Sequence, residues 1–128
     1  MAESIKICSL NCQGLGDIKK RRDVFNYLRR FKYSIICLQD THFSKDIEKL
    51  VKNEWGYETL FCSHNSRSRG VAILFNNNYE FKINNIYIDN SGNVLIADIH
   101  FFKRKISLET IYGPNKDTPN FYVNLEKN

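Results

Sequence analysis

The first third of the chain alternates short hydrophobic runs with amphipathic segments, in the order strand, helix, strand. Ile5–Leu10 and Tyr33–Leu38 are short and densely apolar, as expected of buried strands. Between them, apolar residues recur at i, i+4 and i+7 within Ile18–Phe31, which predicts a helix with one apolar face. Asp17 stands where it can cap the N-terminus of this helix.

The pattern continues with a second helix and then changes to strands in series. Ser44 and Gly56 delimit the second helix, because apolar residues with helical spacing lie between them. These residues are Ile47, Leu50, Val51 and Trp55. The extended segments that follow, separated by turn residues, are Glu58–Cys62, Gly70–Phe75, Phe81–Ile88, Val94–Phe102 and Ile106–Tyr112.

A third helix is predicted close to the C-terminus. Thr118 and Pro119 have the pattern of an N-cap followed by proline at the first helical position. Phe121, Tyr122 and Leu125 would line one side of this helix. Two strand–helix units followed by strands in series predict an α/β fold, in which a mixed β-sheet is flanked by helices.

Polar residues directly follow three of the hydrophobic runs, in the segments SLNCQG, CLQDTH and IYGPN. Open α/β sheets place ligands beyond the ends of their strands. Asn11, Asp40 and Tyr112 therefore offer an amide, a carboxylate and a phenol that could converge on one site. One carboxylate with neutral polar neighbours suits Mg²⁺, which takes few protein ligands and otherwise binds water and substrate phosphate.

Basic residues outnumber acidic ones, 19 to 14, which gives the 128 residues a formal net charge of +5. The surplus is concentrated in four groups: Lys19–Arg22, Arg29–Lys32, Arg67 with Arg69, and Lys103–Lys105. Such groups favour polyanionic partners, with DNA first and RNA second. Arg67 and Arg69 could clamp a phosphate with their guanidinium groups. Basic runs are more often solvated protein faces than binding sites, and that interpretation stays open.

Cysteine usage and hydropathy indicate a soluble intracellular chain, in the nucleus or the cytoplasm. The four cysteines show no spacing typical of a zinc site, so we expect reduced thiols at Cys8, Cys12, Cys37 and Cys62. The N-terminus has no signal-peptide pattern, and no apolar run approaches the length that crosses a membrane. We therefore expect no membrane partner.

Four segments together resemble the endonuclease/exonuclease/phosphatase superfamily, and within it the endonuclease domains of non-LTR retrotransposons. The segments are LNCQGLGDIKKRRDVFNYLRR, SIICLQDTHF, SRSRGVAILFNNN and IYGPN, and the resemblance runs from about Ile5 to Tyr122. It implies two packed β-sheets with helices outside. It also implies hydrolysis of phosphodiester bonds in DNA with a divalent metal, Mg²⁺ or Mn²⁺.

The resemblance implies roles for individual residues. Asn11 matches the asparagine that helps to hold metal and phosphate, Asp40 the acidic metal ligand, and Tyr112 the tyrosine that reaches the scissile phosphate. Asn115 is a further candidate for a phosphate contact. The superfamily usually has glutamate as the metal ligand, and Asp40 is one methylene shorter. A small backbone shift or a bridging water would have to make up the difference.

The chain departs from the family because it lacks the later Asp-x-Asn pair and the terminal Asp-His pair, which would orient the attacking water and protect the leaving group. Asp98 and His100 stand too early to replace them and are interpreted as a sheet-edge or exposed pair. We therefore expect residues 1–128 to form one incomplete domain, resembling the first half of a two-sheet α/β sandwich of deoxyribonuclease type. An uncovered inner sheet face would favour a missing C-terminal half or self-association through that face.

Three functions stay open. The first is a magnesium-dependent DNA endonuclease of retrotransposon type, inactive alone because the later residues are absent. The second is a non-catalytic, basic remnant that binds nucleic acid, and the third is a phosphomonoesterase of the same superfamily. His42 and His64 are interpreted as structural or exposed, with His42 within reach of the site mouth.

Overall fold

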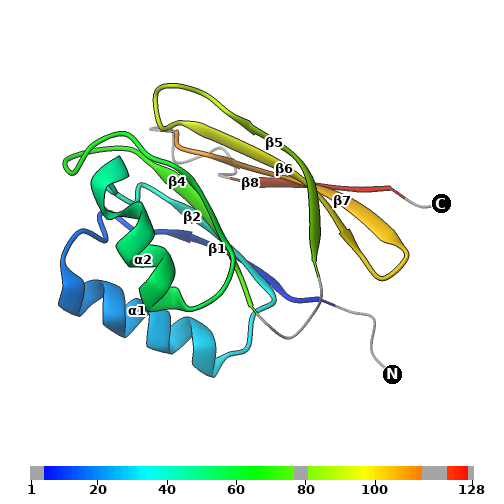
Figure 1. The fold of residues 1–128 in the computed structure, drawn as a ribbon, viewed down its shortest axis with the longest axis horizontal. Helices are drawn as coiled ribbons and strands as arrows, with labels where there is room; N and C mark the ends of the chain where they lie inside the picture. Colours follow the sequence, from blue (N-terminus) through cyan, green and yellow to red (C-terminus); the bar gives the residue numbers. More distant parts are fainter. Residues whose placement is uncertain (1–4, 77–80, 114–120, 127–128) are drawn as a thin grey trace.

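Two four-stranded β-sheets face each other in the computed structural model, which describes residues 5–76, 81–113 and 121–126 (Figure 1). The first sheet consists of β1 (Ile7–Asn11), β2 (Ile35–Gln39), β3 (Thr59–Cys62) and β4 (Val71–Phe75), in the order β1-β2-β4-β3. The second sheet consists of β5 (Lys82–Ile88), β6 (Val94–Phe101), β7 (Arg104–Ile111) and β8 (Phe121–Glu126), paired in sequence order. β1 and β2 are parallel and all other neighbours are antiparallel, so the first sheet is mixed as predicted.

Helices cover the outer face of the first sheet, on the side away from the second sheet (Figure 1). α1 (Ile18–Arg30) begins after Asp17, whose carboxylate accepts a hydrogen bond from the first turn, as predicted for a cap. A short 3-10 helix, η1 (Lys45–Ile47), leads into α2 (Glu48–Trp55). α2 ends at Gly56, whose φ of 97° suits a residue without Cβ.

β2 and β4 are buried on both faces, which explains why their sequences are continuous apolar runs. The core between the two sheets consists of Ile35, Cys37, Cys62, Val71, Ile73, Phe75, Leu95, Ala97, Ile99, Phe101, Ile106 and Leu108. The core beneath the helices consists of Cys12, Leu15, Phe25, Leu28, Ile36, Leu38, Phe43, Val51, Trp55, Ala72 and Leu74. Alternate residues of one strand therefore serve two different cores. The predicted α/β class is confirmed.

The predicted C-terminal helix is wrong for the residues that the structure describes there. Phe121–Glu126 forms β8, an antiparallel strand on the free edge of β7. A sheet edge offers unpaired backbone N–H and C=O groups, which an adjacent extended segment can satisfy. The first residues of β8, FYV, are aromatic or β-branched and suit a strand. Thr118 and Pro119, on which the helix prediction depended, lie outside the described residues.

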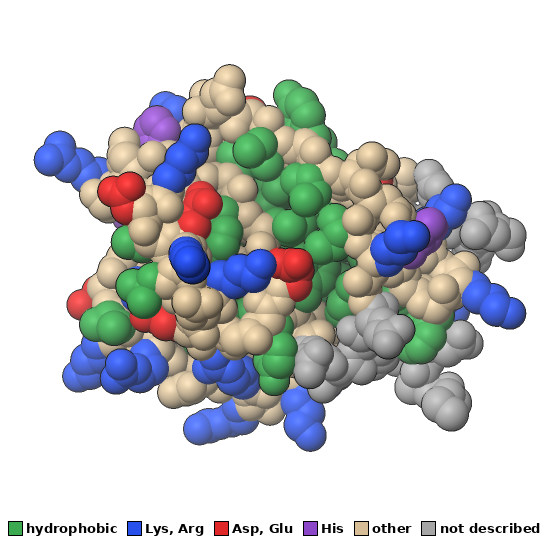
Figure 2. Space-filling view, in the orientation of Figure 1, with side chains coloured by type: hydrophobic (Ala, Val, Ile, Leu, Met, Phe, Trp, Pro, Cys, Tyr) green, Lys and Arg blue, Asp and Glu red, His purple; other side chains and the backbone are tan. Residues whose placement is uncertain are grey.

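The inner face of the first sheet is covered, contrary to the expectation that it would meet water. β2 and β4 pack against β7, and Ile35, Ile73 and Leu108 at this interface are fully buried. Exposed apolar side chains occur on the edge strand β5, where Ile86 is 52% and Tyr87 60% exposed, and also on the helices, where Tyr27 is 53% exposed. Figure 2 shows apolar side chains between the two layers on the side that it presents. Within the second sheet, the exposed apolar side chains of β5 therefore lie on an edge strand, and the inner face of the first sheet stays covered.

Candidate active site

The predicted strand ends lie at one rim of the sandwich, where a buried glutamine ties three strands together. Gln39 is the last residue of β2 and stands opposite Asn11 in the parallel ladder with β1. Its Nε2 donates to Thr110 Oγ1 of β7 at 2.8 Å and lies 3.1 Å from Ser9 Oγ of β1. Because side chains alternate along a strand, Asn11 lies on the same face of β1 as Ser9. Tyr112, directly after β7, likewise lies on the same face as Thr110. One amide thus brings the ends of β1, β2 and β7 together.

Asp40 follows Gln39 and carries the carboxylate of the predicted set. Its Oδ1 lies 2.7 Å from His42 Nε2 and accepts a hydrogen bond from the backbone N–H of Arg69 at 3.2 Å. The backbone of Asp40 has a φ of 57°, in the left-handed region, and its side chain is 19% exposed. The carboxylate is therefore held from two sides and still reaches solvent.

Asn11 ends β1 and is fixed by the turn that follows. Its Oδ1 accepts a hydrogen bond from the backbone N–H of Gln13 at 3.2 Å, an Asx turn that directs the amide nitrogen away from this contact. Lys20, on α1, donates from Nζ to the carbonyl oxygens of Cys12 and Gln13 at 3.0 and 3.3 Å. Backbone carbonyl groups of the turn beside Asn11 therefore hold the ammonium group of Lys20 in place.

Tyr112 directly follows β7 and packs, partly buried, against the core between the sheets. Its backbone N–H donates to the carbonyl oxygen of Asn93 at 2.7 Å. The Oδ1 of Asn93 is buried and has no hydrogen-bond partner among the described residues, although buried polar atoms are normally paired. Next to it, the carbonyl of Gly92 accepts from the N–H of Gly70 at 2.9 Å. The turn between β5 and β6 is therefore joined to the loop that precedes β4.

The two arginines predicted to bind phosphate lie in the loop between β3 and β4. Arg69 belongs to the rim through its backbone, because its N–H donates to Asp40 and its carbonyl accepts from the N–H of His42 at 2.8 Å. Arg67 is exposed and lies in the turn at the tip of this loop. Asn115, the other candidate for a phosphate contact, lies outside the described residues.

Backbone hydrogen bonds continue past the ends of the strands and hold the segment after β2 between two loops. On one side, the N–H of Gly14 donates to the carbonyl of Asp40 at 2.8 Å. On the other side, the N–H of Thr41 donates to the carbonyl of Gly70 at 3.0 Å. A Cβ at Gly70 would lie 2.5 Å from Thr41 Oγ1, so this close approach requires glycine. The rim is an extension of the sheet and not a set of independent loops.

Backbone strain is concentrated at this rim. Of the six non-glycine residues with positive φ in the described part of the chain, four belong to it: Gln13, Asp40, His42 and Arg69. Such conformations cost on the order of 1–3 kcal/mol each and persist where the surrounding structure fixes them, often at functional sites. The geometry around Asp40 is therefore retained against a local cost.

The side chains at the rim fit a hard cation with few protein ligands. No group of three or more His, Cys, Asp or Glu residues that could hold a metal occurs among the described residues. Mg²⁺ binds through one or two carboxylates and keeps several waters, and the partly exposed carboxylate of Asp40 is a ligand of the type that it takes. Zinc needs a fuller ligand set.

All four cysteines are free, and burial raises the pKa of Cys12 to about 12 although Lys20 opposes the shift, so its thiol stays protonated.

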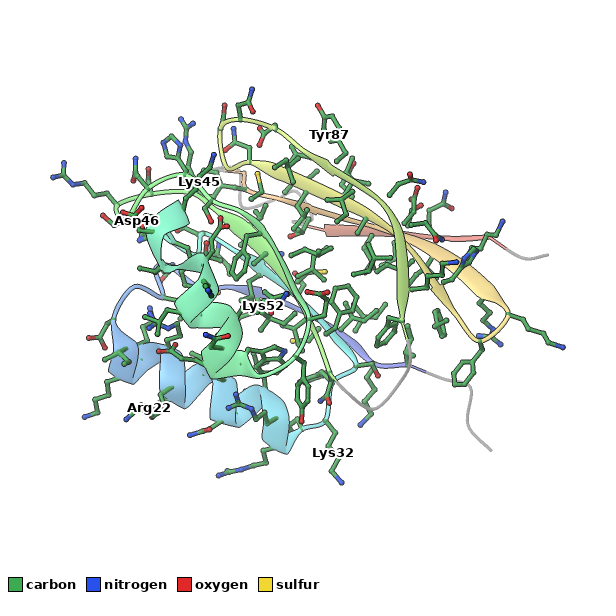
Figure 3. The ribbon with its side chains drawn as sticks, in the orientation of Figure 1. Arg22, Lys32, Lys45, Asp46, Lys52 and Tyr87 are labelled. Carbon is green, nitrogen blue, oxygen red and sulfur yellow. The ribbon has the colours of Figure 1, made fainter. Side chains whose placement is uncertain are left out.

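Basic side chains gather on the helical layer, but they are not all available to a partner. Figure 2 shows Lys and Arg side chains along the side of the molecule formed by the helices, and in Figure 3 Arg22 and Lys32 of the α1 region point outward. Arg21, from the same run, is buried and forms a bidentate ion pair with Glu54 of α2 at 2.6 and 3.1 Å.

No helix among the described residues has the length and apolar character needed to cross a membrane.

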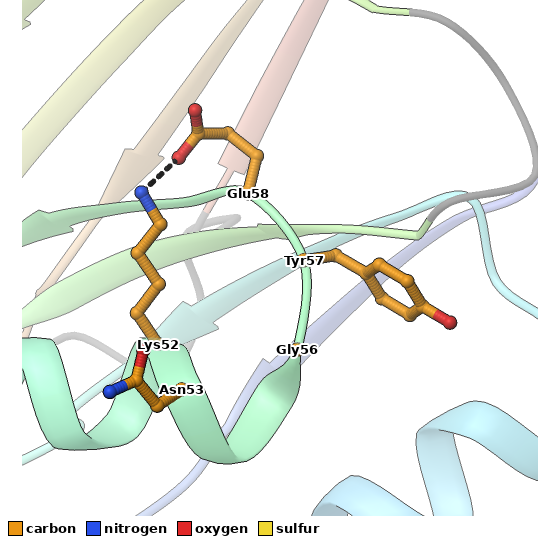
Figure 4. A pocket seen from close by; sticks show the side chains of 5 residues that line it. All are labelled: Lys52, Asn53, Gly56, Tyr57 and Glu58. Carbon is orange, nitrogen blue, oxygen red and sulfur yellow. Dashed lines mark ion pairs between the residues drawn. The ribbon is translucent and has the colours of Figure 1, made fainter.

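A surface pocket of about 360 Å³ lies away from the rim (Figure 4). It is lined by Lys52, Asn53, Gly56, Tyr57 and Glu58, where α2 ends and β3 begins. Lys52 and Glu58 form an ion pair at 2.8 Å, and the hydrogen bond from Lys52 lowers the pKa of Glu58. The first residue of β3, Thr59, pairs with Leu74 near the end of β4. The rim lies at the other end of β4, where Val71 pairs with Gln39. The pocket therefore stands at the opposite end of the first sheet from Asp40.

The residues that organise the rim were not predicted from the sequence. The sequence assigns no role to Ser9, Gln39 or Thr110, although a polar residue in or directly after a buried apolar run is a signal for a specific hydrogen bond. His42 was interpreted as structural or exposed, and it contacts Asp40 directly. Its position two residues after Asp40 was the available signal.

The pair that sequence analysis set aside lies elsewhere. Asp98 accepts a hydrogen bond from Ser107, and His100 pairs with Asn84, in the second sheet. Asp98 and His100 alternate with the buried residues of β6, so they lie on the face turned away from the first sheet. Neither belongs to the rim.

Comparisons with known proteins agree with the predicted resemblance. The chain is 25% identical over 111 residues to the "Transposon TX1 uncharacterized 149 kDa protein" of Xenopus laevis. This match covers 87% of the chain and 8% of that relative, so the chain spans a small part of the relative's length. The model of the Endonuclease/Exonuclease/phosphatase family matches residues 8–126. The chain therefore belongs to the Endonuclease/Exonuclease/phosphatase family.

Proposed function

We propose that this chain is part of a divalent-metal-dependent endonuclease domain of retrotransposon type, which hydrolyses phosphodiester bonds in DNA. The observation that carries the proposal is the buried Gln39 amide, which bonds to both β1 and β7 beside the positions of Asn11, Asp40 and Tyr112. Membership of the family supports a nuclease or phosphodiesterase, and the relative from a transposon supports the retrotransposon type.

The chemistry follows from the groups at the rim. In phosphodiester hydrolysis a water oxygen bonds to phosphorus, the bond from phosphorus to the 3′ oxygen breaks, and that oxygen leaves with a proton. Asp40 would hold Mg²⁺ or Mn²⁺, which supplies Lewis-acid stabilisation of the phosphate charge. The Asn11 amide and the Tyr112 hydroxyl would donate hydrogen bonds to the non-bridging oxygens, where charge develops. Further phosphate contacts are assigned to Arg67, Arg69 and Asn115.

We also propose that residues 1–128 make up one incomplete domain. The sequence has no Asp-x-Asn or Asp-His pair after Tyr112, and these pairs are the ones that would orient the attacking water. Positioning the water and transferring its proton contribute a large part of the rate of such reactions. We therefore expect very weak or no turnover from this chain alone.

Nicking of supercoiled plasmid tests the site and its incompleteness together. We expect little nicking by the chain alone with Mg²⁺ or Mn²⁺, and clear nicking by a chimera that adds the segment following the match in the transposon relative. Asp40→Ala should abolish nicking by the chimera, whereas Asp46→Ala, an acidic residue of η1, should leave it unchanged. Robust nicking by the unextended chain that Asp40→Ala removes would contradict incompleteness. Nicking by the chimera that survives Asp40→Ala would contradict the site.

The basic surface favours a second candidate function, non-catalytic binding of nucleic acid. In that case the affinity for duplex DNA should fall with salt with a log–log slope near −0.9 per phosphate contact, and it should not respond to Mg²⁺ or to Asp40→Ala. The endonuclease proposal expects both responses. A filter-binding titration at several salt concentrations, with and without Mg²⁺, separates the two.

We place the protein inside the cell, in the nucleus or the cytoplasm, with DNA as the main partner and RNA as the alternative. The four free cysteines support a reducing compartment. Burial also raises the pKa of Cys37 to about 12, so this thiol is inert and suits a structural role.

A further inference from the structure

His42 makes a short contact with Asp40 that the proposed chemistry has not used. Its Nε2 lies 2.7 Å from Asp40 Oδ1, which is a hydrogen bond when Nε2 carries the proton. The two side chains are 23% and 19% exposed, so the contact is largely removed from water. Hydrogen bonds to a carboxylate are stronger than neutral ones and stronger still in a partly buried setting.

The imidazole ring is itself held by neighbouring segments. The backbone N–H of His42 donates to the carbonyl of Arg69 at 2.8 Å. The ring lies directly over Gly14, where a Cβ would be 2.7 Å from His42 Nδ1. Gly14 has a φ of 93°, a conformation that glycine adopts without cost. The loop after β1 therefore leaves space for this ring, and the loop before β4 fixes its backbone.

The contacts to Asp40 are directed at one of its oxygens. Oδ1 receives both the His42 side chain and the N–H of Arg69, at 2.7 and 3.2 Å, and these are the side-chain hydrogen bonds of Asp40 within the described ranges. Two donors on one oxygen fix the plane of a carboxylate and leave its second oxygen for an external ligand. Partners of this kind orient carboxylates that bind metals and tune their affinity.

We propose that His42 is a positioning residue, which orients the Asp40 carboxylate through the bond from Nε2 to Oδ1 so that Asp40 can bind a divalent cation. The inference rests on the proposed function, because it needs a cation at Asp40. It also accounts for the backbone cost at this place, since Asp40 and His42 have φ values of 57° and 60°. Both conformations are needed to turn the ring back onto the carboxylate.

The test measures cation binding and not activity. Mn²⁺ is titrated into the chain, and free Mn²⁺ is followed by electron paramagnetic resonance. His42→Ala should weaken Mn²⁺ binding about 10- to 100-fold, the effect usual for such partners of a ligand. His42→Gln, which keeps an N–H donor, should recover part of the loss. His100→Ala is the matched control, because His100 also bonds to a side chain but lies away from the rim, and it should leave binding unchanged.

Each outcome decides between the two proposals. If Asp40→Ala loses binding while His42→Ala binds Mn²⁺ like the wild type, the positioning role is wrong and the metal site stands. If the wild type does not bind Mn²⁺, or Asp40→Ala binds it equally well, the metal site and the positioning role both fail. Thermal unfolding is measured for every variant. If His42→Ala does not fold, His42→Gln decides, since full loss in a folded Gln variant contradicts an orienting N–H donor.

Discussion

At the scale of single residues, the rim depends on a few buried polar side chains. Gln39 and Thr110 are 1% and 0% exposed, and each satisfies the other at 2.8 Å. A buried hydrogen bond contributes modestly when it is intact, but leaving one partner unsatisfied costs the full desolvation of that group. The bond between the sheets is therefore more important for specifying their alignment than for net stability.

Gln39→Leu should reveal this asymmetry. It removes the donor to Thr110 and leaves a buried hydroxyl without its partner, so we expect the free energy of unfolding to fall by about 1–3 kcal/mol in urea titrations. The double variant Gln39→Leu/Thr110→Val should recover part of the loss, because both polar groups are then gone. If the loss in the double variant equals the sum of the losses in Gln39→Leu and Thr110→Val alone, the two side chains are not coupled.

Asp89 predicts a pH dependence of stability. Burial acts to raise its pKa, but hydrogen bonds from the N–H groups of Asn93 and Val94 outweigh burial and lower the pKa of Asp89. A lowered folded pKa stabilises the protein fully above the unfolded value, about 3.9, and the contribution is lost as the pH falls through the folded value. Asp89→Asn should therefore be less stable than the wild type at pH 7, and the difference should shrink below about pH 4. A difference independent of pH would contradict this.

At the scale of elements, Arg29 of α1 joins α1 to the C-terminal end of α2, in addition to the ion pair between Arg21 and Glu54. The guanidinium of Arg29 lies 5.0 Å from the ring centroid of Trp55 and 5.9 Å from that of Phe25. Its Nη2 also donates to the carbonyls of Glu54 and Trp55 at 2.6 and 2.8 Å. Arg29 therefore caps the C-terminal end of α2, where carbonyl groups lack partners within the helix.

Arg29→Lys should weaken this junction although the charge is kept. An ammonium group cannot stack its plane on the indole and donate to two carbonyls in the same way. We expect a loss of about 1–2 kcal/mol in the free energy of unfolding. Arg30→Lys, at the exposed neighbouring position, should change it by less than about 0.5 kcal/mol. Equal effects of the two substitutions would show that Arg29 acts through charge alone.

Local pattern predicted the elements whose partners are near in sequence. α1 followed from its apolar spacing and the Asp17 cap, and β2 from its continuous apolar run. β8 was missed because its conformation depends on the free edge of β7, which no local pattern contains. The bond from Gln39 to Thr110 joins residues 71 positions apart, so it too could not be read from local spacing.

The candidate site was predictable to a similar extent. Motifs at the strand ends predicted Asn11, Asp40 and Tyr112 as site residues, and the fold brings the strand ends that carry them to one rim. The position of His42 two residues after Asp40 indicated that it lies near the site, but the contact itself could not be predicted, because both residues have positive φ values. Sequence periodicity carries no information on such backbone conformations.

At the scale of the whole molecule, the exposed edge of β5 is the expected place for self-association. Ile86, Tyr87 and Ile88 are 52, 60 and 47% exposed, and Tyr87 stands at the outside of the second sheet in Figure 3. An edge strand with exposed apolar residues is prone to pair with another chain. Ile86→Lys should therefore reduce association in concentration-dependent sedimentation, whereas Tyr27→Lys, at an exposed apolar position on α1, should not. A wild type that stays monomeric at high concentration would contradict this.

The amide that crosses from one sheet to the other has a consequence for mechanics. If the two layers slid past each other by one residue, the Gln39 bridge would break and the strand ends that carry Asn11, Asp40 and Tyr112 would lose alignment in the same movement. Loosening of the packing between the two sheets should therefore disrupt the candidate site well before the chain unfolds. Activity at the candidate site would then report sensitively on how tightly the two sheets are packed.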